Sequence, residues 1–111
     1  MAQVQDQTVT TETGTADGDT FTVTVDTTNA DYVVAYVDDG TGSAPAQYDV
    51  STQVSYTADE DNYMPHGSQS GLTSTRNVYS DVTPYTMEFT FTNSSSGTAQ
   101  YRVRVVAIEG N

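Results

Sequence analysis

PYTMEFTFTNSSSGTAQYRVRVVAIE, residues 84–109, is the stretch that decides the fold class. Apolar and polar side chains alternate through 85–92, and the alternation resumes at 99–105 after the turn-forming run 93–97. A period of two residues is typical of a strand with one buried and one exposed face. The pattern therefore predicts two antiparallel strands, 83–92 and 98–109, that pair with each other as a hairpin.

The register of this predicted hairpin follows from side-chain chemistry. If residue 92 pairs with residue 98, Phe89 lies beside Tyr101 on one face, and Glu88 lies opposite Arg102 on the other. Opposite charges at facing positions stabilise a strand pair. A slip by one residue would place Glu88 beside apolar groups, so both the pattern and the charges favour the same register.

Shorter strands are expected along the rest of the chain. No window has apolar residues at helical spacing, while turn-rich segments recur between apolar runs. We expect strands at 20–27, 32–37, 48–56 and 72–79, and a thin, bulged or edge strand within 1–13. The chain is thus predicted to be all-β: a single antiparallel β-sandwich, immunoglobulin-like or jelly-roll-like, of about seven strands over 1–111. The segment 57–71 has no usable period and is predicted to be a long loop.

The run Tyr-Val-Val-Ala-Tyr-Val at 32–37 is apolar on both faces of its predicted strand. A sandwich normally buries one face of each sheet, so the second face needs another cover. A neighbouring copy of the chain is one candidate. The loop 57–71 or the amino-terminal segment, folded over the same face, is the other.

Charge excludes several classes of partner. Fifteen acidic residues face three basic ones, giving a net charge of −12; the bases are Arg76, Arg102 and Arg104, and lysine is absent. Nucleic acid and anionic membrane surfaces both require a basic footprint, so neither is an expected partner. No apolar run approaches the roughly 18 residues of a membrane span. Cysteine is absent, which excludes disulfides and thiolate sites, and residues 1–6 lack the pattern of a secretory signal.

Abundant Asp and Thr without Lys or Cys resembles the composition of proteins from extremely halophilic archaea and their viruses. The resemblance covers the whole chain and involves no motif. It implies a protein suited to molar salt, where the Debye length falls to about 3 Å and repulsion among carboxylates is screened. It also implies a small β-sandwich on a virion surface, as a capsid decoration, turret or tail protein.

Acidic clusters at 17–19, 38–40 and 59–62 are candidate cation sites, because hard cations prefer carboxylate oxygens. None matches the twelve-residue calcium loop. Asp and Gly are also the ordinary residues of turns. We expect no cofactor beyond an unassigned structural cation, for which Asp59 and Asp61 are the candidate ligands.

No catalytic constellation is evident. His66 is the single histidine, with Ser68 and Ser70 near it, but this spacing within a loop is no evidence of a Ser–His pair. Tyr63 and Met64 are apolar residues in a polar segment. They either form part of a protein contact, where Tyr and Met are enriched, or fold back over one end of the sandwich.

Most of the tyrosines have the spacing of core residues, which leaves no aromatic platform for sugars. They are Tyr32, Tyr36, Tyr48, Tyr56, Tyr85 and Tyr101.

These observations predict a non-enzymatic virion structural protein of a halophilic virus. It would be made in the host cytoplasm and would form an oligomeric capsid-surface or tail component. Its expected partners are further copies of itself and another capsid or tail protein. Val33, Val37, Tyr63 and Met64 are the predicted contact residues. The alternative is a secreted, extracellular adhesion or carbohydrate-binding module of a halophile.

Overall fold

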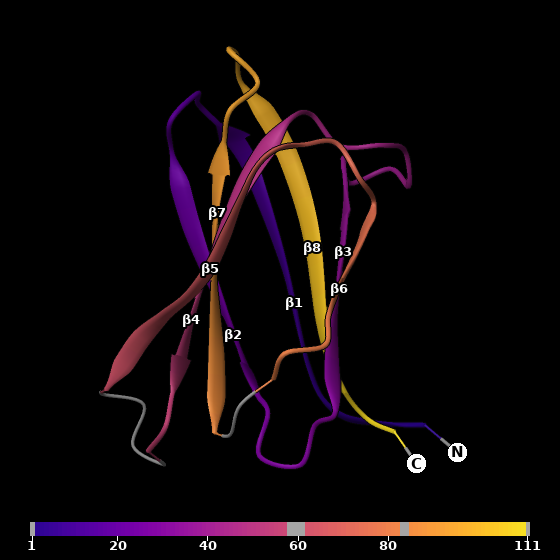
Figure 1. Ribbon diagram of the computed structural model, residues 1–111. Coiled ribbons are helices and arrows are strands. Elements are labelled where there is room, and N and C mark those ends of the chain that lie inside the picture. The colour runs from indigo at the N-terminus through magenta and orange to yellow at the C-terminus, as the bar shows by residue number, and fades with distance from the viewer. Residues whose placement is uncertain (1, 58–61, 83–84, 111) are drawn as a thin grey trace.

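The computed structural model describes residues 2–57, 62–82 and 85–110. These residues form two antiparallel four-stranded sheets packed face to face, which confirms the predicted sandwich (Figure 1). The described chain has no helix long and apolar enough to cross a membrane. The strands are β1 (Gln3–Thr15), β2 (Thr20–Asp26), β3 (Tyr32–Asp38), β4 (Tyr48–Ser55), β5 (Tyr63–Leu72), β6 (Arg76–Tyr79), β7 (Thr86–Asn93) and β8 (Ala99–Glu109).

Sheet A has the strand order β1-β8-β3-β6, and sheet B has the order β2-β7-β4-β5. Most connections therefore carry the chain from one sheet to the other. Of the strands that follow one another in sequence, β4 and β5 pair directly. The predicted edge strand near the amino terminus is confirmed as β1, whose pairing with β8 shifts register twice.

The predicted hairpin of 83–92 with 98–109 is wrong. β7 lies in sheet B between β2 and β4, whereas β8 lies in sheet A between β1 and β3. Phe89 of β7 pairs with Val23 of β2 on one side and with Thr52 of β4 on the other. Tyr101 of β8 pairs with Glu12 of β1. The alternation specifies which face of each strand is buried, but it does not specify the partner strand. The loop after β7 spans the gap of about 10 Å between packed sheets instead of the shorter gap between paired strands.

The expected charge pair also fails to form. Glu88 lies between Thr24 of β2 and Gln53 of β4. Arg102 lies opposite Asp38 of β3 instead. Phe89 and Tyr101 still share one environment, because both project into the core from opposite sheets and both are almost fully buried.

The core lies between the inward faces of the two sheets. Its largest fully buried side chains are aromatic, and they pack as a continuous cluster. Phe21 stacks on Phe91 with ring centroids 5.4 Å apart, Tyr48 lies 6.1 Å from Phe91, and the Tyr79 ring meets Phe89 edge-on at 5.1 Å. Offset and edge-on pairs of this kind add about 0.5–1.5 kcal/mol each beyond the area they bury.

The predicted loop 57–71 is wrong for most of its length, because β5 occupies Tyr63–Leu72 and raises the number of strands among the described residues to eight. β5 is the edge strand of sheet B, and most of its side chains are exposed. Its pairing with β4 shifts register twice, once beside Pro65. An exposed, irregular edge strand has no apolar alternation to detect, so backbone pairing rather than side-chain burial defines it.

Candidate binding surface

The outward faces of the two sheets differ in chemistry. On sheet B, the outward positions of β2 and β7 carry hydroxyl and acidic side chains. Rows such as Thr22–Thr90–Ser51 and Thr24–Glu88–Gln53 run across the sheet. This face is polar throughout these rows and suits contact with water.

The outward face of sheet A is apolar and basic. Strand register places its side chains in rows that cross β1, β8, β3 and β6. One row joins Val9, Arg104, Tyr36 and Arg76, and the next joins Gln7, Val106, Val34 and Val78. Val9, Tyr36 and Val78 are each 43–50% exposed, which is unusual for large apolar side chains. We call this surface the arginine face and define it as Val4, Val9, Tyr36, Arg76, Val78, Arg102, Arg104 and Ile108.

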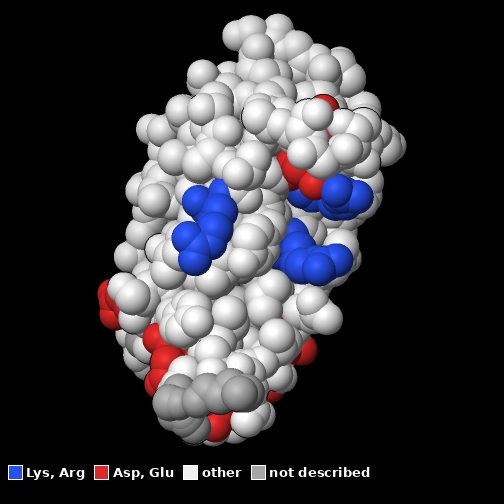
Figure 2. Space-filling model, turned by 90° about the vertical axis from the view of Figure 1, so that its right-hand side faces the viewer, with Lys and Arg blue, Asp and Glu red and all other residues white. Residues whose placement is uncertain are grey.

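The arginine face contains a shallow groove of about 820 Å³, whose walls include Val4, Tyr36, Arg76 and Arg104. Figure 2 shows the basic groups gathered on this side of the molecule, with acidic groups beside one of them and toward one end. All three arginines of the chain belong to this face. In a chain of net charge −12, it is therefore a local region of positive charge.

Arg102 is neutralised within the chain. Its Nε atom donates to Asp38 Oδ1 at 3.0 Å and to Oδ2 at 3.1 Å, and its Nη2 atom also contacts Oδ2. The hydrogen bonds from Arg102 lower the pKa of Asp38, and the same hydrogen bonds raise the pKa of Arg102. The backbone N–H of Gly40 donates to Asp38 as well, at 2.8 Å. This pair fixes the start of the loop that follows β3.

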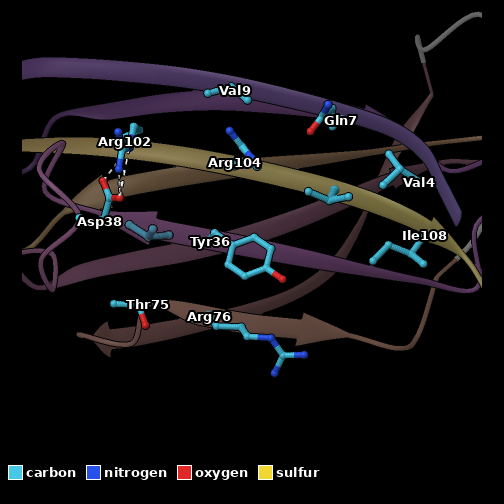
Figure 3. A pocket seen from close by; sticks show the side chains of 13 residues that line it. Val4, Gln7, Val9, Tyr36, Asp38, Thr75, Arg76, Arg102, Arg104 and Ile108 are labelled. Carbon is cyan, nitrogen blue, oxygen red and sulfur yellow. Dashed lines mark hydrogen bonds and ion pairs between the residues drawn. The ribbon is translucent and has the colours of Figure 1, made fainter. Parts of the chain in front are cut away.

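Arg76 and Arg104 are different, because neither forms an ion pair or a side-chain hydrogen bond with the described residues. Each is the direct cross-strand neighbour of Tyr36, Arg76 on β6 and Arg104 on β8. In Figure 3 the Tyr36 ring lies flat over the strands between them, with its face turned outward. The row therefore presents two uncompensated guanidinium groups on either side of an exposed aromatic ring.

The predicted contact residues do not form one surface. Val33 and Val37 point into the core and are 0% and 1% exposed, so they are wrong as contact residues. Sheet B covers them within the same chain, which removes one reason to expect a second copy there. Met64 is 55% exposed at the start of β5, and the neighbouring Tyr63 is half-buried; both belong to sheet B rather than sheet A.

The tyrosine prediction is correct in part. Tyr48 and Tyr101 are buried core residues, whereas Tyr36, Tyr56 and Tyr85 are 39–54% exposed. Tyr36 has the parity of Tyr32, opposite to the inward Val33 and Val37. A strand apolar on both faces gives no signal as to which parity faces the core.

His66 serves the structure of the open edge between β5 and the segment after β6. Its Nε2 atom donates to the backbone oxygen of Asp81 at 2.7 Å, and its Nδ1 atom lies 3.0 Å from Thr52 Oγ1. Neither Ser68 nor Ser70 has a hydrogen bond to it. The ring therefore links β4 and β5 to the chain leading into β7.

The acidic clusters are partly explained by turn geometry. The Asp39 carboxylate accepts from the backbone N–H and the hydroxyl of Thr41 at 2.9 and 2.6 Å, and from Ser43 N–H at 3.2 Å. The Thr41 hydrogen bonds lower the pKa of Asp39. The candidate cation ligands Asp59 and Asp61 lie outside the described residues. Within the described ranges, no group of three or more acidic or histidine side chains is placed to hold a metal ion.

The important members of the arginine face were not identified from the sequence, although a signal for them exists. Arg102 and Arg104 share parity with Val106 and Ile108 on β8, so the outward side of this strand is basic at one end and apolar at the other. Their alignment with Tyr36 and Arg76 depends on strand order, which the alternation does not encode.

No family model and no curated protein matches the sequence. Solved structures do resemble the fold. The Yersinia pseudotuberculosis-derived mitogen is 14% identical, with a TM-score of 0.56 over 90% of this chain and 86% of that chain. The Aeromonas hydrophila periplasmic inhibitor of g-type lysozyme is 11% identical, with a TM-score of 0.53 over 96% of this chain and 85% of that chain. At this identity the likeness establishes a shared β-sandwich fold.

Proposed function

We propose that the chain is a non-enzymatic structural protein that attaches to a larger protein assembly through its arginine face. One observation carries the proposal: apolar side chains and all three arginines gather on the outward face of sheet A of an otherwise acidic molecule. Exposed apolar patches on soluble proteins mark interaction sites. Tyr and Arg are the residue types enriched where binding energy concentrates in protein interfaces.

The proposed setting is the surface of a virus particle from a salt-rich environment, in the capsid or the tail. The acidic composition supports this setting, since screening in molar salt removes most of the repulsion among fifteen acids. The arginine face supports attachment there, because its aliphatic side chains retain their driving force when salt screens the charges.

The alternative setting is a secreted binding module. The two solved neighbours support it, one being a mitogen and the other an inhibitor that acts on lysozyme. Both settings use the fold as a scaffold for binding. They differ in the location of the partner.

Site-specific photo-cross-linking tests the proposal. Position 36 carries a benzoylphenylalanine in place of tyrosine, and a matched control carries it at Thr22 on the outward face of sheet B. Each protein is irradiated in molar salt with virus particles or cell-envelope fractions from the source of the chain. We expect a discrete cross-linked band from position 36 and none from position 22.

The band's composition decides the setting. A partner from virus particles supports the leading proposal, and a partner from the cell envelope supports the alternative. Equal cross-linking from positions 36 and 22, or none from either, would contradict attachment through the arginine face.

A further inference from the structure

The row Arg76–Tyr36–Arg104 has the geometry of a two-pronged anion clamp. Its members occupy facing positions on β6, β3 and β8. Neighbouring strands lie about 4.8 Å apart, so the two arginines start roughly 10 Å from each other with the tyrosine between them. All three side chains are exposed.

The two guanidinium groups of this row remain without a partner in a molecule rich in carboxylates. Fifteen acids are present, yet among the described residues only Arg102 of the three arginines has a carboxylate within ion-pair distance. Arginine is the side chain best suited to hold a carboxylate through two parallel hydrogen bonds. The row thus offers two such sites to an external ligand.

The surroundings indicate what kind of ligand fits. Val9 and Val78 flank the row, and Val4 and Ile108 extend the same face. Saccharides bind by stacking on several aromatic rings and by hydrogen bonds, and aliphatic side chains provide neither. A polypeptide that carries both carboxylates and apolar side chains matches both parts of this surface.

A second copy of the chain does not supply that match. If the arginine face met itself, unpaired arginines would approach unpaired arginines. The outward face of sheet B carries carboxylates such as Asp26 and Glu88, but its β2, β7 and β4 positions are Thr, Ser, Gln and acidic residues, and aliphatic character in these rows is confined to Pro65 on the edge strand β5. Neither sheet face of a second copy combines carboxylates with a broad aliphatic surface, which favours a different protein as the occupant.

We propose that the row Arg76–Tyr36–Arg104 docks an acidic segment of a different protein, with one carboxylate on each arginine and an apolar side chain over the Tyr36 ring. This inference rests on the proposed function, because it specifies the partner of the arginine face. Successive side chains of an extended segment alternate between its two faces, so carboxylates at residues i and i+4 share a face and lie roughly 13 Å apart at about 3.3 Å per residue. The flexible arginine side chains can span this separation, and the side chain of residue i+2 then lies over the Tyr36 ring.

The test uses the chain of residues 1–111, labelled with ¹⁵N, and a blocked pentapeptide Glu-Ser-Leu-Ser-Glu as the probe, whose two glutamates and central leucine share one face when the peptide is extended. Amide shifts are followed during titration at 0.1 M and at 2 M NaCl. We expect saturable shifts confined to β3, β6 and β8, with weak binding in the millimolar range. The Gln-Ser-Leu-Ser-Gln peptide should bind at least about tenfold more weakly, since it lacks both carboxylates.

Variants assign the effect to the row. Arg76→Gln and Arg104→Gln should each weaken binding by about fivefold or more. The matched control is Thr22→Gln, which introduces the same side chain on the outward face of sheet B, away from the row. It should change binding by less than about twofold. Each variant's thermal midpoint is measured alongside, so that loss of folding is recognised.

Three results would overturn the inference. One is equal binding of the glutamate and glutamine peptides. The second is tighter binding of an acidic oligosaccharide, such as oligogalacturonate, at the same row. The third is an oligomer of the parent chain, seen by sedimentation, that Arg76→Glu dissociates, because the occupant would then be a second copy.

Failure here is distinguishable from failure of the proposed function. A cross-link from position 36 that survives Arg76→Gln and Arg104→Gln would retain attachment through the arginine face and reject the carboxylate clamp. Peptide binding at the row without any cross-linked partner would support the clamp and reject the proposed assembly role.

Discussion

Replacing Asn93, the last residue of β7, should destabilise the protein more than any single polar substitution in the loop that follows it. Asn93 is fully buried at the end of β7, where the chain leaves sheet B for sheet A. Its Nδ2 atom donates to the backbone oxygens of Thr15 and Gly97 at 2.6 and 2.7 Å, and its Oδ1 atom accepts from Ser95 N–H at 2.8 Å. Asn93 thereby ties the end of β1 to the connection between the sheets.

The expected loss in the free energy of unfolding follows from these three backbone groups. Asn93→Ala removes one hydrogen bond from each of two carbonyl oxygens and one N–H, and each loss costs about 1 kcal/mol, giving about 3 kcal/mol in total. The Tyr101 hydroxyl also lies 3.1 Å from Asn93 Oδ1. Losing this contact adds little to the sum, because the hydroxyl keeps the backbone oxygen of Gln47 as its acceptor at 2.7 Å. At about 4 °C per kcal/mol for a domain of this size, the thermal midpoint should fall by roughly 12 °C.

Asn93→Asp separates this mechanism from simple loss of volume. The substitution places a carboxylate oxygen against two carbonyl oxygens, so burial and repulsion raise the pKa of the new carboxyl in the folded state. A raised folded-state pKa means that stability increases as pH falls toward the ordinary carboxyl range. The aspartate variant should therefore recover stability on mild acidification relative to the alanine variant.

Urea unfolding, with an unchanged m-value as the criterion for a comparable transition, measures both variants against the parent. Ser95→Ala is the matched control, because it removes a hydroxyl bonded to the same Gly97 oxygen at 3.2 Å in an exposed position. It should cost less than about 0.5 kcal/mol. A loss below about 1 kcal/mol for Asn93→Ala would show that water replaces the amide. That result would refute the idea that Asn93 holds the connection between the sheets together.

Three further predictions concern the core, the charge and pH. Phe89→Ala and Val103→Ala, both at 0% exposure, should each cost about 2–5 kcal/mol in urea melts; a loss below half a kcal/mol would contradict their burial. Raising NaCl from 0.1 to 2 M should stabilise the chain by on the order of 2 kcal/mol in thermal melts, and a flat response would contradict salt adaptation. Hydrogen bonds from Arg102 lower the pKa of Asp38, so the ionised Asp38 carboxylate stabilises the folded state. This contribution is fully present above the ordinary aspartate range and disappears as pH falls through the lowered pKa. Asp38→Asn should therefore lose less stability than the parent between pH 5 and pH 2, as acid-unfolding curves would show.

The class of the fold was predictable from the sequence because burial imposes a period on each strand separately. Val23 and Val25 of β2, and Val50 and Val54 of β4, point inward as their alternation predicts. Strand order was not predictable by the same means. The alternation in β7 and β8 fits a hairpin and a crossover between sheets equally well, and only the packing of eight strands selects the crossover.

The candidate site was less predictable than the fold, for a related reason. Arg76 and Arg104 are 28 positions apart and lie on strands that both pair with β3. Their common neighbour, Tyr36, has the chemistry of a core residue and no alternation around it to show that it points outward. A site formed by a row across strands becomes visible only when strand order and register are known.

The arrangement of charge gives the arginine face its significance for association. A chain of net charge −12 repels acidic proteins over most of its surface, including copies of itself. Where Arg76 and Arg104 flank Tyr36, the local sign is reversed, so an acidic partner is directed toward this one face. Molar salt weakens such attraction at long range but affects direct guanidinium–carboxylate contacts less once they are covered by apolar side chains. A surface that combines both kinds of side chain can therefore retain a specific partner under conditions that screen purely ionic recognition.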